Sequence, residues 1–245
     1  MIDAHCHIDQ FKKPLEIAQR AELEKITTIG VTSLPEHFEL GYQHLKNFKD
    51  VKLALGYHPM LAGKEKFNEP LFKTLSKKTP YIGEIGLDFS KKNPSNRELQ
   101  IDILKKIFRI ISDQPRFISL HSRKAEKSLF DILIHHKIKK AIFHWYSGPL
   151  NLIDNILSAG YFFSINPAMI HSKNGQKIIE RIPADRILTE TDGPYVMAKG
   201  KPAEPKDVRF VLEHLKIIWN KSFEEIDQTI QENFNKIIRE IAISR

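Results

Sequence analysis

Two histidines near the start of the sequence have the spacing of a metal-binding pair. His5 and His7 stand two residues apart in the apolar run Ile2 to His7. Because side chains alternate between the two faces of a β-strand, both imidazoles point to one side and Cys6 points to the other. Burying two imidazoles on one face is costly unless something binds them. We therefore expect a metal ion at this strand, with Asp3 on the same face to orient a ligand.

More side chains of the ligand type stand at or just beyond the ends of later apolar runs. These are Glu84, His121, His144 and Asp192. In a barrel of parallel strands the C-terminal ends of the strands meet at one rim, where the active site is built. Mixed imidazole and carboxylate ligands suit Mg, Mn or Zn, and Fe or Ni as well, but six ligands exceed the three of a usual catalytic zinc site. The set predicts two divalent ions that share a carboxylate.

Two ions about 4 Å apart can activate a water and stabilise the attacking and leaving oxygens of a phosphodiester. Hydrolysis of a phosphate ester is the reaction that this site predicts, with Asp192 binding one ion and accepting a proton from the water. Arg123 and Lys124, just beyond His121, are positioned to hold a phosphate, Arg123 with two parallel hydrogen bonds. His58, after the third run, is positioned to donate to a phosphate oxygen.

Eight short apolar runs alternate with stretches of helical periodicity, which predicts a single (β/α)8 barrel domain over residues 1–245. The expected strands are Ile2 to His7, Thr27 to Thr32, Val51 to Gly56, Tyr81 to Glu84, Phe117 to His121, Ala141 to His144, Tyr161 to Ile165 and Ile187 to Thr191. The expected helices cover residues 14–25, 37–48, 66–76, 96–112, 125–136, 149–158, 171–180 and 205–217. Two further amphipathic helices, Ser222 to Ile230 and Asn233 to Ile243, are expected to pack outside the ring.

Composition places the chain among ordinary globular proteins, with 41% hydrophobic and 28% charged residues. Cys6 is the only cysteine, and no basic-then-apolar leader precedes Ile2, so we expect a cytoplasmic protein. No run reaches the apolar length of a membrane span. The net charge of +8 favours a polyanionic partner.

The placement of the positive charges divides them between two ends of the expected barrel. Loops that follow strands lie at the catalytic rim, and they carry Lys91, Lys92, Arg123, Lys124, Lys199 and Lys201. Loops that precede strands lie at the far end, and they carry Lys77, Lys78, Lys139 and Lys140. The first set predicts a funnel for a polyanion, and the second set a solvated surface.

Six motifs, in order along the chain, resemble those of the TatD family of metal-dependent deoxyribonucleases. They are Asp3-Ala-His-Cys-His-Ile-Asp9, Gly56-Tyr-His-Pro59, Gly83-Glu-Ile-Gly-Leu-Asp88, His121-Ser-Arg-Lys-Ala125, His144-Trp-Tyr-Ser-Gly148 and Glu190-Thr-Asp-Gly-Pro-Tyr195. The resemblance implies two divalent ions and cleavage of DNA, often from the 3′ end of single strands. It also implies that His5, His7, Glu84 and Asp192 bind one ion, and that Glu84 bridges to a second held by His121 and His144.

Within the family, the short loops and two segments look most like QatD, the TatD-like nuclease of Qat antiphage defence systems. The segments are Asn166-Pro-Ala-Met169 and Thr189-Glu-Thr-Asp-Gly-Pro194. This likeness implies DNA and other proteins of such a system as partners. Where family members commonly carry Arg-Asn-Glu-Pro after the eighth strand, this chain has Pro202-Ala-Glu-Pro205, so its contacts to substrate differ there.

Two other functions compete with a deoxyribonuclease. An amidohydrolase-like enzyme acting on small esters, lactones or amides also begins with His-x-His, but many such enzymes bridge their ions with a modified lysine on the fourth strand, where this chain has Glu84. A binding subunit of a defence complex, with conditional nuclease activity, would fit the altered rim and the outer helices.

Overall fold

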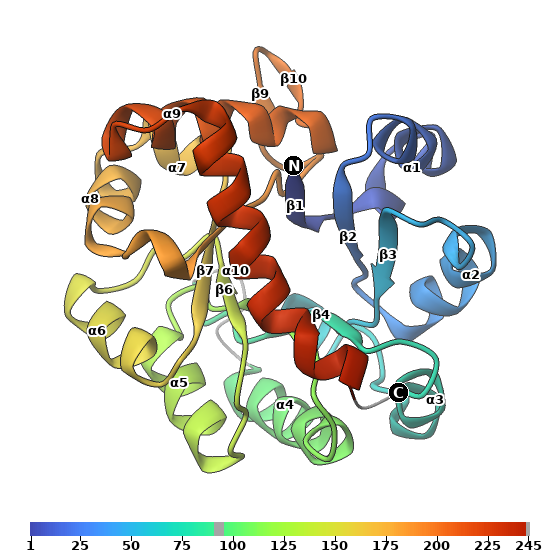
Figure 1. Ribbon diagram of the computed structural model, residues 1–245. Helices are drawn as coiled ribbons and strands as arrows, with labels where there is room; N and C mark the ends of the chain where they lie inside the picture. The colour runs from blue at the N-terminus through green and yellow to red at the C-terminus, as the bar shows by residue number, and fades with distance from the viewer. Residues whose placement is uncertain (91–95, 244–245) are drawn as a thin grey trace.

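Eight parallel strands form the wall of a barrel in the computed structural model, which describes residues 1–90 and 96–243 (Figure 1). The strands are β1 (Ile2–Cys6), β2 (Thr27–Val31), β3 (Val51–Ala54), β4 (Tyr81–Gly86), β5 (Phe117–His121), β6 (Ile142–His144), β7 (Phe162–Ile165) and β8 (Ile187–Thr189). They pair in the order β1-β2-β3 and β4-β5-β6-β7-β8. The fold is the (β/α)8 barrel that the spacing of the apolar runs predicts.

Two seams join these sheets into a ring. At the first, Leu55 continues β3 and bridges Ile82 of β4, and its carbonyl accepts from the N–H of Gly83 at 2.9 Å. At the second, the N–H of Asp192 donates to the carbonyl of His5 at 2.9 Å. The second seam therefore joins the first and last strands at the rim where the predicted ligands lie.

The buried carboxylate of Asp3 reinforces the second seam. Its Oδ1 accepts from the N–H of Thr191 at 2.9 Å and its Oδ2 from the hydroxyl of Thr191 at 2.6 Å. The N–H of His5 also donates to Oδ1, at 3.3 Å. Burial raises the pKa of Asp3 well above its ordinary value despite these hydrogen bonds. Asp3 thus contacts the backbone of His5, where the sequence led us to expect a partner that orients a ligand.

Helices surround the strands on all sides (Figure 1). They are α1 (Pro14–Leu23), α2 (Pro35–Leu45), α3 (Glu69–Leu75), α4 (Arg97–Ile111), α5 (Glu126–His135), α6 (Leu150–Ser158), α7 (Pro167–His171), α8 (Lys173–Arg181), α9 (Val208–Trp219) and α10 (Phe223–Ile243). Proline stands in the first turn of α1, α2, α3 and α7, where its missing N–H leaves no helical hydrogen bond unmade.

The two expected C-terminal helices are one continuous helix, so that prediction was wrong. Asn233, the first residue of the second expected helix, uses its side-chain amide to donate to the carbonyls of Ala184 and Ile187 at 2.7 and 2.8 Å. Buried apolar residues continue at helical spacing on both sides of it, from Ile226 to Ile241. The helix also lies elsewhere than expected: α10 crosses one end of the barrel and contacts β1, β5 and β8 (Figure 1).

Two smaller differences lie near β7 and β8. The expected helix over 171–180 is preceded by α7, and Ser172 separates the two helices and caps α8 by accepting from the N–H of Gly175 at 3.0 Å. The loop after β8 contains a short antiparallel pair, β9 (Met197–Ala198) and β10 (Lys201–Pro202).

Buried apolar side chains form a cluster that extends from Ile2 on β1 to Ile241 on α10. Within the described residues, none of the helices is long and apolar enough to cross a membrane.

Candidate metal centre

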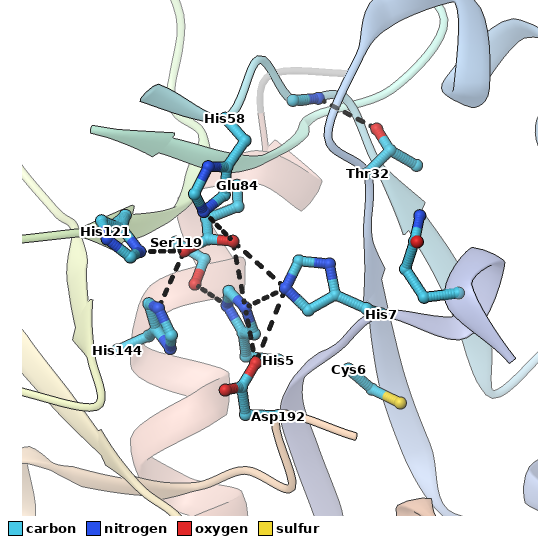
Figure 2. A network of polar contacts seen from close by, with 12 residues as sticks. His5, Cys6, His7, Thr32, His58, Glu84, Ser119, His121, His144 and Asp192 are labelled. Atoms are coloured by element: carbon cyan, nitrogen blue, oxygen red, sulfur yellow. Dashed lines mark hydrogen bonds and ion pairs between the residues drawn. The ribbon is translucent and has the colours of Figure 1, made fainter. Parts of the chain in front are cut away.

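The six side chains predicted to bind metal converge at the C-terminal ends of the strands (Figure 2). β1 and the residue after it supply His5 and His7, β4 supplies Glu84, and β5 and β6 end in His121 and His144. Asp192 follows β8. The side chains point toward one another, while Cys6 is turned away from them (Figure 2). Among residues 1–90 and 96–243, three groups have ligand atoms within 4.8 Å of one another: His5, His144 and Asp192; His5, His7 and Glu84; and His58, Glu84 and His121.

Glu84 lies at the centre, and its two oxygens face different histidines. Oε1 lies 2.6 Å from Nδ1 of His121 and 2.9 Å from Nε2 of His144. Oε2 lies 3.1 Å from Nε2 of His7 and 3.8 Å from Nε2 of His5. Glu84 therefore offers one carboxylate oxygen to the His121 and His144 side of the site and the other to the His5 and His7 side.

Glu84 is also held as an anion. It is 1% exposed, and burial alone would raise its pKa, but His58, His144 and His121 outweigh that effect and hold the pKa well below its ordinary value. Its Oε2 has no hydrogen-bond partner in the part of the chain that the structure describes. A buried, anionic, unpaired oxygen beside imidazole nitrogens has the donor chemistry of a divalent-ion site, so the residues present fit such ions.

His5 is the most deeply buried of the predicted histidine ligands. Burial and the neighbouring His144 hold its pKa well below the ordinary value. The rings of His5 and His144 stack at 3.8 Å with an angle of 6° between their planes, and Nε2 of His5 lies 3.3 Å from Nε2 of His7. Two imidazole nitrogens so close together on buried rings are suited to face a cation.

Asp192 faces the first pair of histidines. Its Oδ1 lies 3.6 Å from Nε2 of both His5 and His7. Burial raises the pKa of Asp192 to about 7, despite the opposing effect of His144 and His7. A carboxyl group with a pKa near neutrality can both bind a cation and exchange a proton.

Three of the four predicted histidine ligands have a polar side chain behind the ring that was not among the predicted site residues. Ser119 Oγ lies 2.7 Å from Nδ1 of His5, and Asp88 Oδ2 lies 3.0 Å from Nε2 of His121. Glu190 Oε1 lies 3.5 Å from Nδ1 of His144. Such contacts fix the ring and the nitrogen that faces the ion.

Further hydrogen bonds hold the side chain of Glu190 in place. It is fully buried and accepts hydrogen bonds from the hydroxyl of Ser164, from Nδ2 of Asn166 at 3.0 Å and from the N–H of Trp145 at 3.1 Å. Asp88 and Glu190 both belong to motifs that carry the family resemblance, but nothing in their spacing distinguished them from surface carboxylates.

The three residues predicted to hold phosphate are placed differently. His58 lies beside the ligands, with Nε2 3.3 Å from Glu84 Oε2, and burial lowers its pKa. Arg123 is exposed and lines a cavity of about 730 Å³ above the metal centre. Lys124 is exposed and is not part of the cavity lining.

Fewer basic side chains line the cavity than the sequence predicts. Arg123 and Lys64 are the lysine and arginine side chains that line the cavity in the described part of the chain. Lys199 instead lies over the ring of Phe210, 4.6 Å from its centroid. Lys91 and Lys92, which were also expected in this funnel, lie outside the described residues. At the far end, Lys140 was expected on a solvated surface, but it is half-buried and donates to the carbonyl of Lys236 on α10 at 2.6 Å.

The model of the family described as TatD related DNase matches residues 2–239. This chain belongs to the TatD family. Members of the family similar to it include an uncharacterized metal-dependent hydrolase of Methanocaldococcus jannaschii, 33% identical over 97% of this chain and 96% of that protein. The human deoxyribonuclease TATDN3 is 26% identical over 97% of this chain and 94% of its own length.

Solved TatD structures have the same fold. A TatD homologue of Escherichia coli superposes with a TM-score of 0.86 at 23% identity, covering 97% of each chain. A TatD-family hydrolase of Entamoeba histolytica superposes with a TM-score of 0.81 at 18% identity, again covering 97% of each chain. Together with the His, Glu and Asp clusters, family membership makes this TatD protein a metal-dependent hydrolase.

Proposed function

We propose that this TatD-family hydrolase cleaves phosphodiester bonds of DNA with two divalent metal ions, removing nucleotides from the 3′ end of single strands. The observation that carries the proposal is the position of Glu84, whose two oxygens face separate pairs of histidines at the base of an open cavity. A bridging carboxylate of this kind suits two-metal hydrolysis of phosphate esters.

One ion would be held by His5, His7 and Asp192, and the other by His121 and His144, with Glu84 shared between them. When bound, the ions supply Lewis acidity to the water and to the phosphate oxygens. Mg, Mn and Zn are the ions that this ligand set favours.

The remaining steps belong to the side chains of the cavity. Asp192, with a pKa of about 7, accepts the proton that the attacking water loses. Arg123 at the cavity wall binds the phosphate by parallel hydrogen bonds, and His58 donates to a phosphate oxygen from beside Glu84. Ser119, Asp88 and Glu190 hold the ligand rings in place.

DNA as the substrate is supported by four observations. The matching family model is described as a DNase, and similar proteins from human and mouse are named deoxyribonuclease and putative deoxyribonuclease. The cavity is lined by Lys64 and Arg123, and the chain has a net charge of +8, both of which favour a polyanion.

The test is cleavage of a 5′-labelled single-stranded oligodeoxynucleotide with Mg²⁺ or Mn²⁺. We expect a ladder of products shortened from the 3′ end, and its loss in the His5→Ala/Glu84→Ala double variant. No cleavage, or cleavage that the double variant retains, would overturn the proposal. A matched oligoribonucleotide and a small carboxylic ester, assayed in parallel, identify RNA or ester hydrolysis if either is the preferred reaction.

We further propose a role in antiphage defence together with other proteins of a Qat system. The support is the likeness of residues 166–169 and 189–194 to QatD and the departure of residues 202–205 from the usual family motif. Phage plaque counts on cells carrying the complete system should rise when the His5→Ala variant replaces the wild-type protein. Unchanged plaque counts, with no co-purifying protein, would count against this role.

A further inference from the structure

Two aromatic side chains stand exposed at the cavity above the metal centre. Trp145 is 38% exposed and Tyr195 is 60% exposed, and both line the cavity. The other large apolar side chains that are exposed in the described part of the chain are leucines, isoleucines and one methionine. Trp145 and Tyr195 are therefore the exposed aromatic side chains among them. Exposed apolar surface concentrated at a cavity indicates a binding role.

The backbone of Trp145 is held in a conformation that bulky residues rarely adopt. Its φ is +38°, in the left-handed region. Its N–H donates to Oε1 of the buried Glu190 at 3.1 Å, and Glu190 is itself fixed by Ser164 and Asn166. A strained backbone at a functional site persists only when the surroundings enforce it. The network therefore fixes Trp145 at the cavity wall directly after His144.

Tyr195 is fixed beside a different part of the centre. Its ring meets the ring of His7 edge to face, with centroids 4.9 Å apart and an angle of 81°. Its N–H donates to the carbonyl of Asp192 at 2.9 Å. Trp145 follows His144, and Tyr195 contacts His7, so the two rings belong to different ligand groups of the centre.

The neighbouring Tyr146 has none of these properties. It is 1% exposed, its hydroxyl donates to the carbonyl of Pro149 at 2.8 Å, and its ring packs edge to face on Phe163 at 5.3 Å. Burial raises the pKa of its hydroxyl well above the ordinary value, which keeps the hydroxyl neutral. It is a packing residue, which leaves Trp145 as the aromatic residue of its motif that can meet a ligand.

Resting on the proposed function, we propose that Trp145 and Tyr195 stack on the nucleobases at either side of the scissile phosphate and thereby select unpaired DNA. Every base presents a planar face that stacks on an aromatic ring, so such contacts tolerate any sequence. In a duplex those faces are covered by neighbouring bases, and the substrate must therefore be single-stranded where it enters the cavity. Arg123 and Lys64 complement the two rings by attracting the phosphates.

The test compares kcat and KM of Trp145→Ala and Tyr195→Ala on a single-stranded oligodeoxynucleotide and on the same strand lacking one base near its 3′ end. Each alanine variant should lose roughly 5- to 140-fold in kcat/KM on the complete strand, chiefly through KM, which is the range of one lost stacked base. Removing the matching base should cost the wild-type enzyme a similar factor and the alanine variant nothing more. Trp145→Phe and Tyr195→Phe should restore most of the activity.

Two controls separate stacking from a structural role. Ile217→Ala removes a side chain that is 79% exposed on α9 and does not line the cavity, and it should leave kcat/KM unchanged. Bound metal per chain should be the same in the alanine variants as in the wild type. If the alanine variants cleave like the wild type, or lose as much on the strand lacking the base, the stacking proposal is overturned.

A binding readout makes the result independent of cleavage. The chain has two tryptophans, so in a Trp219→Phe variant the remaining fluorescence comes from Trp145. Stacking should quench that fluorescence when a single-stranded oligodeoxynucleotide is added, and a base-free deoxyribose phosphate polymer should not. Quenching without cleavage would support stacking and refute the proposed nuclease function. Cleavage without quenching would support the nuclease function and refute stacking on Trp145.

Discussion

Asp88 Oδ2 lies 3.0 Å from Nε2 of His121, on the side of the ring opposite to Glu84. The other ring nitrogen, Nδ1, lies 2.6 Å from Glu84 Oε1. Asp88 is itself held, since its Oδ1 accepts from the N–H of Ser90 at 2.8 Å and its own N–H donates to Gln100 Oε1 at 2.8 Å. The orientation of His121 therefore depends on a carboxylate that is not among the six predicted metal ligands.

Asp88→Ala should weaken binding of the second ion while leaving the first. Loss of a partner behind a ligating histidine typically costs about 10- to 100-fold in metal affinity. Titration calorimetry with Mn²⁺ should show two sites of similar affinity in the wild type and one weakened site in the variant. Asp131→Ala, which removes an exposed carboxylate on α5, is the control; equal weakening by both variants would contradict the assignment.

Glu84→Gln should remove the second ion and most of the activity. The amide keeps the shape of the side chain but lacks the charge that bridges two cations. Loss of several kcal/mol of charge stabilisation corresponds to roughly 10²- to 10³-fold or more in kcat. The number of bound metal ions per chain should fall from two to one or none. A variant that still binds two ions and turns over DNA normally would exclude Glu84 as the bridge.

Metal binding should release more protons at pH 6 than at pH 8, partly from Asp192. With a pKa of about 7 in the metal-free protein, Asp192 is about 90% protonated at pH 6 and about 10% at pH 8, and it must ionise to bind a cation. Asp192→Asn should therefore release nearly one proton fewer at pH 6 and almost the same number at pH 8, measured by calorimetry in buffers of different ionisation enthalpy. Identical proton release by the two proteins at pH 6 would show that Asp192 is already ionised there.

Thr191→Val should destabilise the barrel through its second seam. The substitution keeps the shape of the side chain but removes the hydroxyl that donates to Asp3 Oδ2 at 2.6 Å, leaving a buried carboxylate with one partner fewer. The free energy of unfolding should fall by about 1–3 kcal/mol, measured by urea denaturation. Thr74→Val, at an exposed position of α3, should change it far less.

The barrel and the residues at its rim could be predicted because both follow from patterns that recur along the sequence. Apolar runs recur eight times, and a ligand-type side chain stands at the end of five of the strands or just beyond them. The break expected between Ile230 and Asn233 was wrong, since the helix continues through Asn233, whose side-chain amide is satisfied by the distant carbonyls of Ala184 and Ile187. Such long-range hydrogen bonds have no local signature in the sequence.

The residues that orient the site could not be predicted for a related reason. Ser119, Asp88 and Glu190 are ordinary polar residues whose roles depend on which ring nitrogen each one faces. Even the position of His58, with Nε2 3.3 Å from Glu84 Oε2, depends on how the loop after β3 folds back onto β4. Residue type and strand position predict which side chains meet, whereas their angles of approach come from packing.

Each of the four consecutive residues 190–193 makes a different contact in the site. Glu190 holds Trp145 and faces His144, Thr191 binds Asp3, Asp192 faces His5 and His7, and the carbonyl of Gly193 accepts from the N–H of His7 at 2.8 Å. Inserting or deleting a single residue here would shift the register, so that none of these four contacts would be made by the residue that now makes it. Anyone grafting new loops onto this scaffold to change its substrate can exchange the segments after β3 and β6, but should carry this tetrapeptide over intact.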